Sequence, residues 1–261
     1  MTTEQNVRVT RPGDDGVGVV EIMRGPENYL TVFILRDLLD ALRDLDADPA
    51  CGAIVVRSEG KHFCAGRDWG TARHPEDTAE AIYAVAPELL AVDTPWIAEL
   101  TGGSIGVGMG LALCADYRVA ADSAYLWPKF VKIGIHHGFG LTATLPWLVG
   151  PQRATELLSL GARVGMTQAG PWGLVDRVVP LDEVGQAAHA FAAELAAQPR
   201  DALAAIRRTM RAPLRERFAE AIVHERRTQT ALYESKDFQQ ATGGGYRYED
   251  AGSPRSRSAR R

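Results

Sequence analysis

Two glycine-bearing segments decide how this chain of 261 residues is expected to fold: residues 60–68, GKHFCAGRD, and residues 102–110, GGSIGVGMG. The first follows an apolar, strand-like run, and the second follows a similar run and opens a helix. Small residues let the backbone approach a ligand closely. Amides at the start of a helix point outward and carry partial positive charge. Two such turns facing each other would present two N–H groups to one oxygen atom.

The apolar pattern around these turns predicts an α/β architecture. Leucines recur at helical spacing over residues 35–45, and a second helix-like run ends at Cys114. Repeated units of strand and helix are typical of α/β domains. Strands are expected at four valine-rich or apolar runs, residues 17–23, 53–57, 96–100 and 117–121.

The C-terminal part of the chain has a different composition. From about Leu181 alanine, arginine and glutamate recur in periodic stretches, which predicts helices that end or begin at Pro199 and Pro213. The last residues are rich in glycine, serine and arginine and have no apolar periodicity. We therefore expect a core over residues 1–194, a helical region over 195–242 and a flexible basic tail over 243–261.

Composition and charge exclude several classes of function. A chain with 46% hydrophobic and 24% charged residues is ordinary for a globular domain, and a net charge of -4 disfavours nucleic acid as a partner. No apolar run approaches the roughly 20 residues that cross a bilayer, and no signal peptide is recognisable, so we expect a cytoplasmic protein without membrane partners. The 3 cysteines are not spaced as in a disulfide framework, and the 6 histidines are not spaced as metal ligands. We therefore expect no disulfide and no metal site.

In this order and spacing, the two turns resemble the enoyl-CoA hydratase/isomerase (crotonase) family, whose hallmarks are an F-C-A-G-x-D-like turn and a later G-x-G turn that opens a helix. The resemblance implies a spiral of ββα turns and a C-terminal helical region that packs homotrimers or dimers of trimers. It also implies lyase or isomerase chemistry on an acyl-CoA thioester. Coenzyme A then enters as part of the substrate, and no separate cofactor is expected. Residues 112–120, 132–134, 148–150 and 170–179 agree further.

Carried over to this sequence, the family's oxyanion hole corresponds to the backbone N–H groups of Arg67 and Val107. These two donors would stabilise a thioester enolate, and the loss of one would cost roughly 3 kcal/mol of barrier. Arg24 resembles the family's contact to a CoA phosphate. The residues expected to border bound CoA are Phe63, Cys64, Ala65, Gly66, Asp68 and Gly106.

The sequence departs from the family's hydratases at both positions that carry their catalytic glutamates, which here are Gly110 and Lys129. A third position, an aspartate in dienoyl-CoA isomerases, aligns near Gly138. The candidates for proton transfer are then Lys129, His136 and His137. Histidine titrates near neutral pH, whereas lysine becomes a base only when burial or a neighbouring cation lowers its pKa.

Two alternatives stay open at the level of sequence. Residues 102–106, GGSIG, match the G-x-S-x-G nucleophile elbow of α/β-hydrolases, in which Ser104 would be the nucleophile of an esterase. The second alternative is a non-catalytic acyl-CoA binder that keeps the two turns without acid–base groups. The residues that could complete a serine triad in chain order are Asp176 or Asp182 with His189 or His224.

Overall fold

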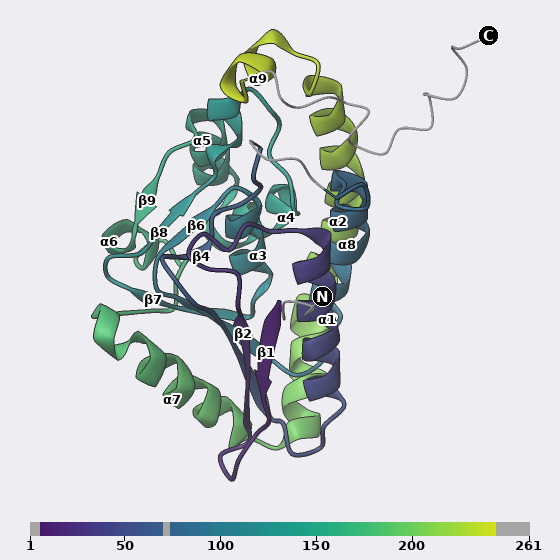
Figure 1. Ribbon diagram of the computed structural model, residues 1–261. Helices are drawn as coiled ribbons and strands as arrows, with labels where there is room; N and C mark the ends of the chain where they lie inside the picture. The colour runs from purple at the N-terminus through teal and green to yellow at the C-terminus, as the bar shows by residue number, and fades with distance from the viewer. Residues whose placement is uncertain (1–5, 70–73, 244–261) are drawn as a thin grey trace, which may run out of the picture.

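The computed structural model describes residues 6–69 and 74–243 of the chain (Figure 1). Its larger sheet has the order β1-β2-β3-β5-β7-β10, in which β1 is antiparallel to β2 and the other neighbours are parallel. Every strand predicted from the sequence is present in this sheet. The strands are β1 (Val7–Thr10), β2 (Val17–Ile22), β3 (Ala53–Ser58), β5 (Trp96–Leu100), β7 (Tyr117–Ala121) and β10 (Arg177–Val179).

A smaller sheet of order β4-β6-β8-β9 is built from short strands that follow those of the larger sheet. Each of the pairs β3–β4, β5–β6 and β7–β8 gives one strand to each sheet before the chain enters a helix. The predicted repetition of two strands and a helix is therefore confirmed. The strands are β4 (His62–Cys64), β6 (Gly103–Ile105), β8 (Tyr125–Trp127) and β9 (Val164–Gly165).

Helix α3 (Val107–Cys114) has all of its residues buried, so it forms the centre of the core. Helix α1 (Val32–Asp46) is the predicted leucine-rich helix, and the Thr31 side chain caps it by accepting from the Ile34 N–H. The other helices up to the C-terminal region are α2 (Ala79–Val85), η1 (Ala86–Leu90), η2 (Lys129–Ile133), α4 (Leu141–Val149), α5 (Pro151–Leu160), α6 (Met166–Ala169), η3 (Leu181–Glu183) and α7 (Val184–Ala196).

The C-terminal region consists of helix α8 (Arg200–Leu232) and the short helix α9 (Lys236–Ala241), which follows at the top of Figure 1. Helix α8 begins directly after Pro199, as predicted, but the prediction that a helix ends at Pro213 is wrong. Pro213 is exposed, so water can satisfy the carbonyl that loses its N–H partner. Buried neighbours such as Leu214 and Phe218 hold the helix on the core.

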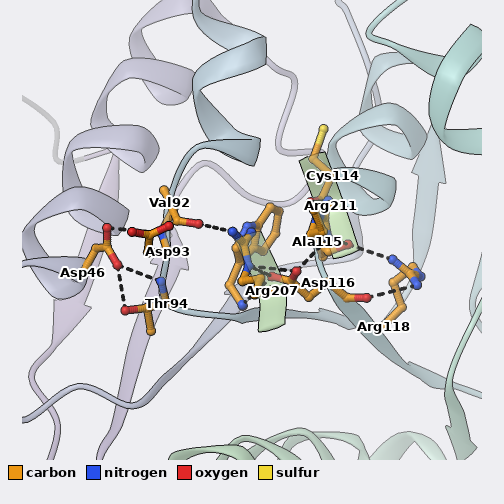
Figure 2. A network of polar contacts seen from close by, with 11 residues as sticks. Asp46, Val92, Asp93, Thr94, Cys114, Ala115, Asp116, Arg118, Arg207 and Arg211 are labelled. Atoms are coloured by element: carbon orange, nitrogen blue, oxygen red, sulfur yellow. Dashed lines mark hydrogen bonds and ion pairs between the residues drawn. The ribbon is translucent and has the colours of Figure 1, made fainter. Parts of the chain in front are cut away.

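A buried polar network ties α8 to the sheet (Figure 2). Asp116, directly before β7, accepts from the Trp96 N–H at 3.0 Å and from two arginines of α8. The Arg207 Nε lies 2.9 Å and the Arg211 guanidinium 2.8 Å from its carboxylate. Asp116 thus joins α8 to β5.

The chain passes into the C-terminal helices at residues 197–199, between the end of α7 and the start of α8. The predicted basic tail falls almost wholly on residues 244–261, outside the described residues. Within the described ranges, no helix is long and apolar enough to span a membrane.

Candidate active site

The two glycine-bearing turns lie side by side because the strands that lead into them are neighbours. Strands β4 and β6 are parallel and pair His62 with Gly103, so their carboxyl ends bring both turns to the same edge of the smaller sheet. Gly66 has a φ of +90°, a conformation that favours glycine. A Cβ atom at Gly66 would lie 2.7 Å from the Ile105 carbonyl oxygen and 4.0 Å from the Val107 nitrogen. The turns are therefore in direct contact.

The contact extends into helix α3, since a side chain at Gly108 would overlap the Cys64 carbonyl. Val107 is the first residue of this helix, where an N–H has no partner within the helix. In the described ranges, neither the Val107 N–H nor the Arg67 N–H donates a backbone hydrogen bond. Two amide donors from adjacent turns are thus available to a ligand.

A cavity of about 310 Å³ opens beside these amides. It brings together seven of the residues singled out in the sequence. The other residues that line the cavity have aromatic, apolar or titratable side chains, and they include Tyr29, Trp69, Phe130 and Ile133. The predicted residues that line it are Ala65, Gly66, Arg67, Asp68, Gly106, Val107 and Lys129.

Three side chains of the first turn, those of Phe63, Cys64 and Arg67, point into the protein rather than into the cavity. Phe63 and Cys64 are fully buried, and burial raises the pKa of the Cys64 thiol to about 11. The Arg67 guanidinium donates to Asp77 Oδ1 at 2.8 Å and to the Leu30 carbonyl at 3.0 Å. Any ligand contact of these three residues is therefore made through the backbone.

Arg24 lies in an adjoining cavity of about 330 Å³, which shares Tyr29, Arg67 and Asp68 with the first. Because these three residues line both cavities, the two cavities adjoin each other. An extended ligand whose reactive end reaches the two amides would pass close to Arg24.

His136 and His137 lie on the turn between η2 and α4 with their rings stacked at 4.0 Å between centroids. Neither residue lines the two cavities just described. His136 Nδ1 lies 2.6 Å from the His137 carbonyl oxygen, and His137 Nε2 lies 2.9 Å from Thr142 Oγ1. Burial, together with His136 and His224 nearby, lowers the pKa of His137 to about 3. His137 is therefore a weak base.

Gly110 and Gly138, two positions at which the sequence analysis expected a carboxylate to be missing, face space that other side chains fill. A Cβ atom at Gly110 would lie 2.7 Å from the Phe139 Cβ, and one at Gly138 would overlap the Tyr83 hydroxyl. Tyr83 is buried and donates to Gln229 Oε1 at 2.9 Å. Neither position can accept a glutamate or aspartate without rearrangement.

Sequence reasoning missed a pair of titratable residues in the cavity, Glu27 and His62. Glu27 Oε2 lies 3.2 Å from His62 Nε2, and the Gly103 N–H donates to His62 Nδ1 at 3.3 Å. Burial lowers the pKa of His62. His62 falls within the first turn, but Glu27 lies far upstream, and no spacing in the sequence links it to this site.

The geometry required for a serine hydrolase is absent at Ser104. Ser104 is fully buried within β6, where it pairs with Leu126 of β8, so its hydroxyl is not presented on a turn. Two of the four proposed triad partners, His189 and Asp176, are engaged elsewhere. His189 lies 2.6 Å from Asp15, and Asp176 forms an ion pair with Arg118.

Comparison with known proteins decides between the enoyl-CoA hydratase/isomerase family and the α/β-hydrolases. The family model described as Enoyl-CoA hydratase/isomerase matches residues 13–255. The chain belongs to this family. It is an enzyme of the enoyl-CoA hydratase/isomerase family, and the serine-hydrolase alternative is wrong, since both the match and the burial of Ser104 contradict it.

Relatives in this family carry different activities in their names. A "Probable enoyl-CoA hydratase" of Mycobacterium tuberculosis is 28% identical over 239 residues, covering 90% of this chain and 92% of the relative. A 4-chlorobenzoyl coenzyme A dehalogenase of an Arthrobacter species is 31% identical over 209 residues, covering 76% of each chain. The crystal structure of an enoyl-CoA hydratase from Mycobacterium avium subsp. paratuberculosis superimposes with a TM-score of 0.81 at 27% identity, covering 92% of this chain and 95% of that one.

In the part of the chain that the structure describes, no group of three or more histidine, cysteine or acidic side chains could hold a metal ion. The three cysteines are free and buried.

Proposed function

We propose that this enzyme binds an acyl-CoA thioester and stabilises its enolate through the backbone N–H groups of Arg67 and Val107. The observation that carries the proposal is the contact between the two turns, where Gly66 lies against Ile105 at the edge of the cavity. Preorganised donors aimed at a developing oxyanion lower the barrier most when they need no rearrangement during the reaction. Both donors follow closely after the paired strands β4 and β6, which hold the two turns against each other.

We further propose that coenzyme A lies along Ala65, Gly66, Asp68 and Gly106, with a phosphate near Arg24. The adjoining cavities support this path, because Arg24 lines the second and the four other residues line the first. Phe63 and Cys64 would support the path from below. Their side chains are buried directly under the turn.

For proton transfer, each of the three candidates, His136, His137 and Lys129, meets part of what a base at this cavity needs. Lys129 lines the cavity, whereas the two histidines do not. A carbonyl oxygen only accepts hydrogen bonds, so contact with the His137 carbonyl places the hydrogen of His136 on Nδ1 and leaves the lone pair on Nε2. His137 is a weak base, as its lowered pKa shows. Lys129 is exposed and lacks the burial that a lysine base requires.

The experiment is hydrogen exchange at the acyl α-carbon, followed by mass spectrometry of butyryl-, crotonyl- and acetoacetyl-CoA in deuterated buffer. The proposal predicts deuterium incorporation that at least one of His136→Ala, His137→Ala and Lys129→Ala slows by a factor of about 100 or more. His189→Ala is the matched control, since His189 is an exposed histidine paired with Asp15. Exchange that is unchanged in His136→Ala, His137→Ala and Lys129→Ala would contradict the assignment of the base. Binding without any exchange would favour a non-catalytic acyl-CoA binder.

We also propose a cytoplasmic homotrimer or dimer of trimers. Exposed apolar side chains on neighbouring helices, Val131 of η2, Trp147 of α4 and Leu160 of α5, support an interface with other copies. Light scattering after size-exclusion chromatography tests the number of copies. A monomer of 28.3 kDa at micromolar concentration would contradict it.

A further inference from the structure

We infer that Lys129 selects acyl groups that carry a carboxylate, which narrows the substrate class of the cavity beside the two amides and rests on the function proposed above. Lys129 is the first residue of η2, directly after β8, and lines this cavity together with Arg67 and Val107. A cation next to an enolate site attracts a negatively charged group on the same substrate.

The ammonium group of Lys129 lies over an aromatic ring and has no anionic partner among the described residues. Its Nζ lies 4.9 Å from the centroid of the Trp127 ring, and Trp127 is itself held by donation from Nε1 to the Gly161 carbonyl at 2.9 Å. A ring face attracts a cation weakly and leaves the ammonium donors available. Among the described residues, the ion pairs involve other cations and not Lys129.

Among the described residues, neither carboxylate of the cavity, Glu27 or Asp68, forms an ion pair with Lys129. Glu27 lies 3.2 Å from His62 Nε2, which occupies one of its oxygens. Asp68 also has an interaction of its own. The charge that complements Lys129 is therefore expected to arrive with the ligand.

Gly110 and Gly138, the other two positions at which the sequence analysis expected a carboxylate to be missing, cannot supply the charge either. Phe139 fills the space at Gly110, and the Tyr83 hydroxyl fills the space at Gly138.

The rest of the cavity suits the apolar part of such an acyl group. Ile105, Phe130 and Ile133 line it next to Lys129. Methylene groups against these side chains lose contact with water, while the terminal carboxylate reaches the ammonium. The cavity of about 310 Å³ has room for a short acyl chain.

The experiment compares binding of malonyl-, succinyl- and glutaryl-CoA with binding of the same three thioesters as methyl esters, by calorimetry. Esterification removes the charge and keeps the acyl chain. We expect at least one acid to bind about tenfold more tightly than its ester, the usual scale of a charge-assisted hydrogen bond. Lys129→Met should abolish that preference and Lys129→Arg should keep it. Lys132→Met is the matched control, since Lys132 lies on the same short helix outside the cavity.

Two outcomes would overturn the inference: no acid preferred over its ester, or a preference that survives Lys129→Met. Equal weakening of free coenzyme A and of every thioester by Lys129→Met would also overturn it, because Lys129 would then contact a CoA phosphate. Deuterium exchange in butyryl-CoA separates this inference from the proposed function. Exchange without a carboxylate preference defeats the inference alone, and failure of all CoA thioesters to bind defeats the proposed function.

Discussion

Phe139 lies against Gly110 so closely that a Cβ atom at position 110 would be 2.7 Å from the Phe139 Cβ and 2.9 Å from its carbonyl oxygen. Phe139 is fully buried and has a φ of 60°. The absence of a side chain at position 110 is thus coupled to a bulky side chain on the facing turn. A glutamate placed at position 110 alone would clash with Phe139.

Gly110→Ala should destabilise the protein by about 1–3 kcal/mol, since the added methyl overpacks the core against Phe139. Urea unfolding measures this. In a Phe139→Ala background the same change should cost less, because the methyl group then has space. Equal costs in both backgrounds would show that Phe139 is not what excludes a side chain at position 110.

Asp116→Asn should cost roughly 3–5 kcal/mol at neutral pH, because it leaves Arg207 and Arg211 buried without their partner. Burial alone would raise the pKa of Asp116, but Arg211 and Arg207 hold it below its ordinary value of 3.8. The contribution of the charged carboxylate is complete above that value and is lost as pH falls below it. The stability gap between the two proteins should therefore narrow below about pH 4 in urea unfolding.

Asp93→Asn is the control for that prediction, since Asp93 forms an exposed ion pair with Arg208. Its cost should stay below about 1 kcal/mol. A cost for Asp116→Asn no larger than for Asp93→Asn would contradict the structural role of the buried network.

His137 should make the protein less stable in mild acid. Its pKa is lowered by burial, by His136 and by His224 to about 3 in the folded state, against 6.5 ordinarily, so the unfolded chain takes up the proton first. Stability then falls as pH drops from 6.5 towards 3, by about 2 kcal/mol at pH 5. His137→Gln should remove this share of the pH dependence in urea unfolding, whereas His189→Gln should not. An unaltered pH dependence in His137→Gln would show that His137 is protonated equally in both states.

The sequence predicted the parts of the fold that depend on local pattern. The apolar runs predicted both ends of β5 and of β7 correctly. The two glycine segments predicted the turns that meet at the cavity. It did not predict that α8 continues through Pro213, because the packing that holds the helix comes from distant residues.

The same limit applies to the candidate site. The proposed oxyanion amides were assigned from the resemblance of the two glycine segments to the family's turns. The lack of space at Gly110, by contrast, depends on Phe139, and the placing of Glu27 depends on His62. The sequence named Lys129 and the two histidines together as proton carriers. Of these, only Lys129 lines the cavity, and this follows from the pairing of β6 with β8 rather than from residue type.

Pro213→Ala should stabilise the protein by about 1–3 kcal/mol, since proline in a helix interior is disfavoured and position 213 is exposed. Thermal or urea unfolding measures the gain. Pro199→Ala, at the exposed start of the same helix, should change stability by less than about 0.5 kcal/mol. Destabilisation by Pro213→Ala would mean that the proline sets a bend that the packing of α8 needs.

The most direct test of the oxyanion hole is the infrared carbonyl frequency of butyryl-CoA labelled with ¹³C at its thioester carbon. If the Arg67 and Val107 amides bind the carbonyl oxygen, the stretch of the bound thioester should move to lower wavenumber than that of the thioester in water. Gly66→Ala should weaken the shift, because Gly66 has a φ of +90° and no space towards Ile105. A bound thioester whose carbonyl frequency equals that in water would contradict the account.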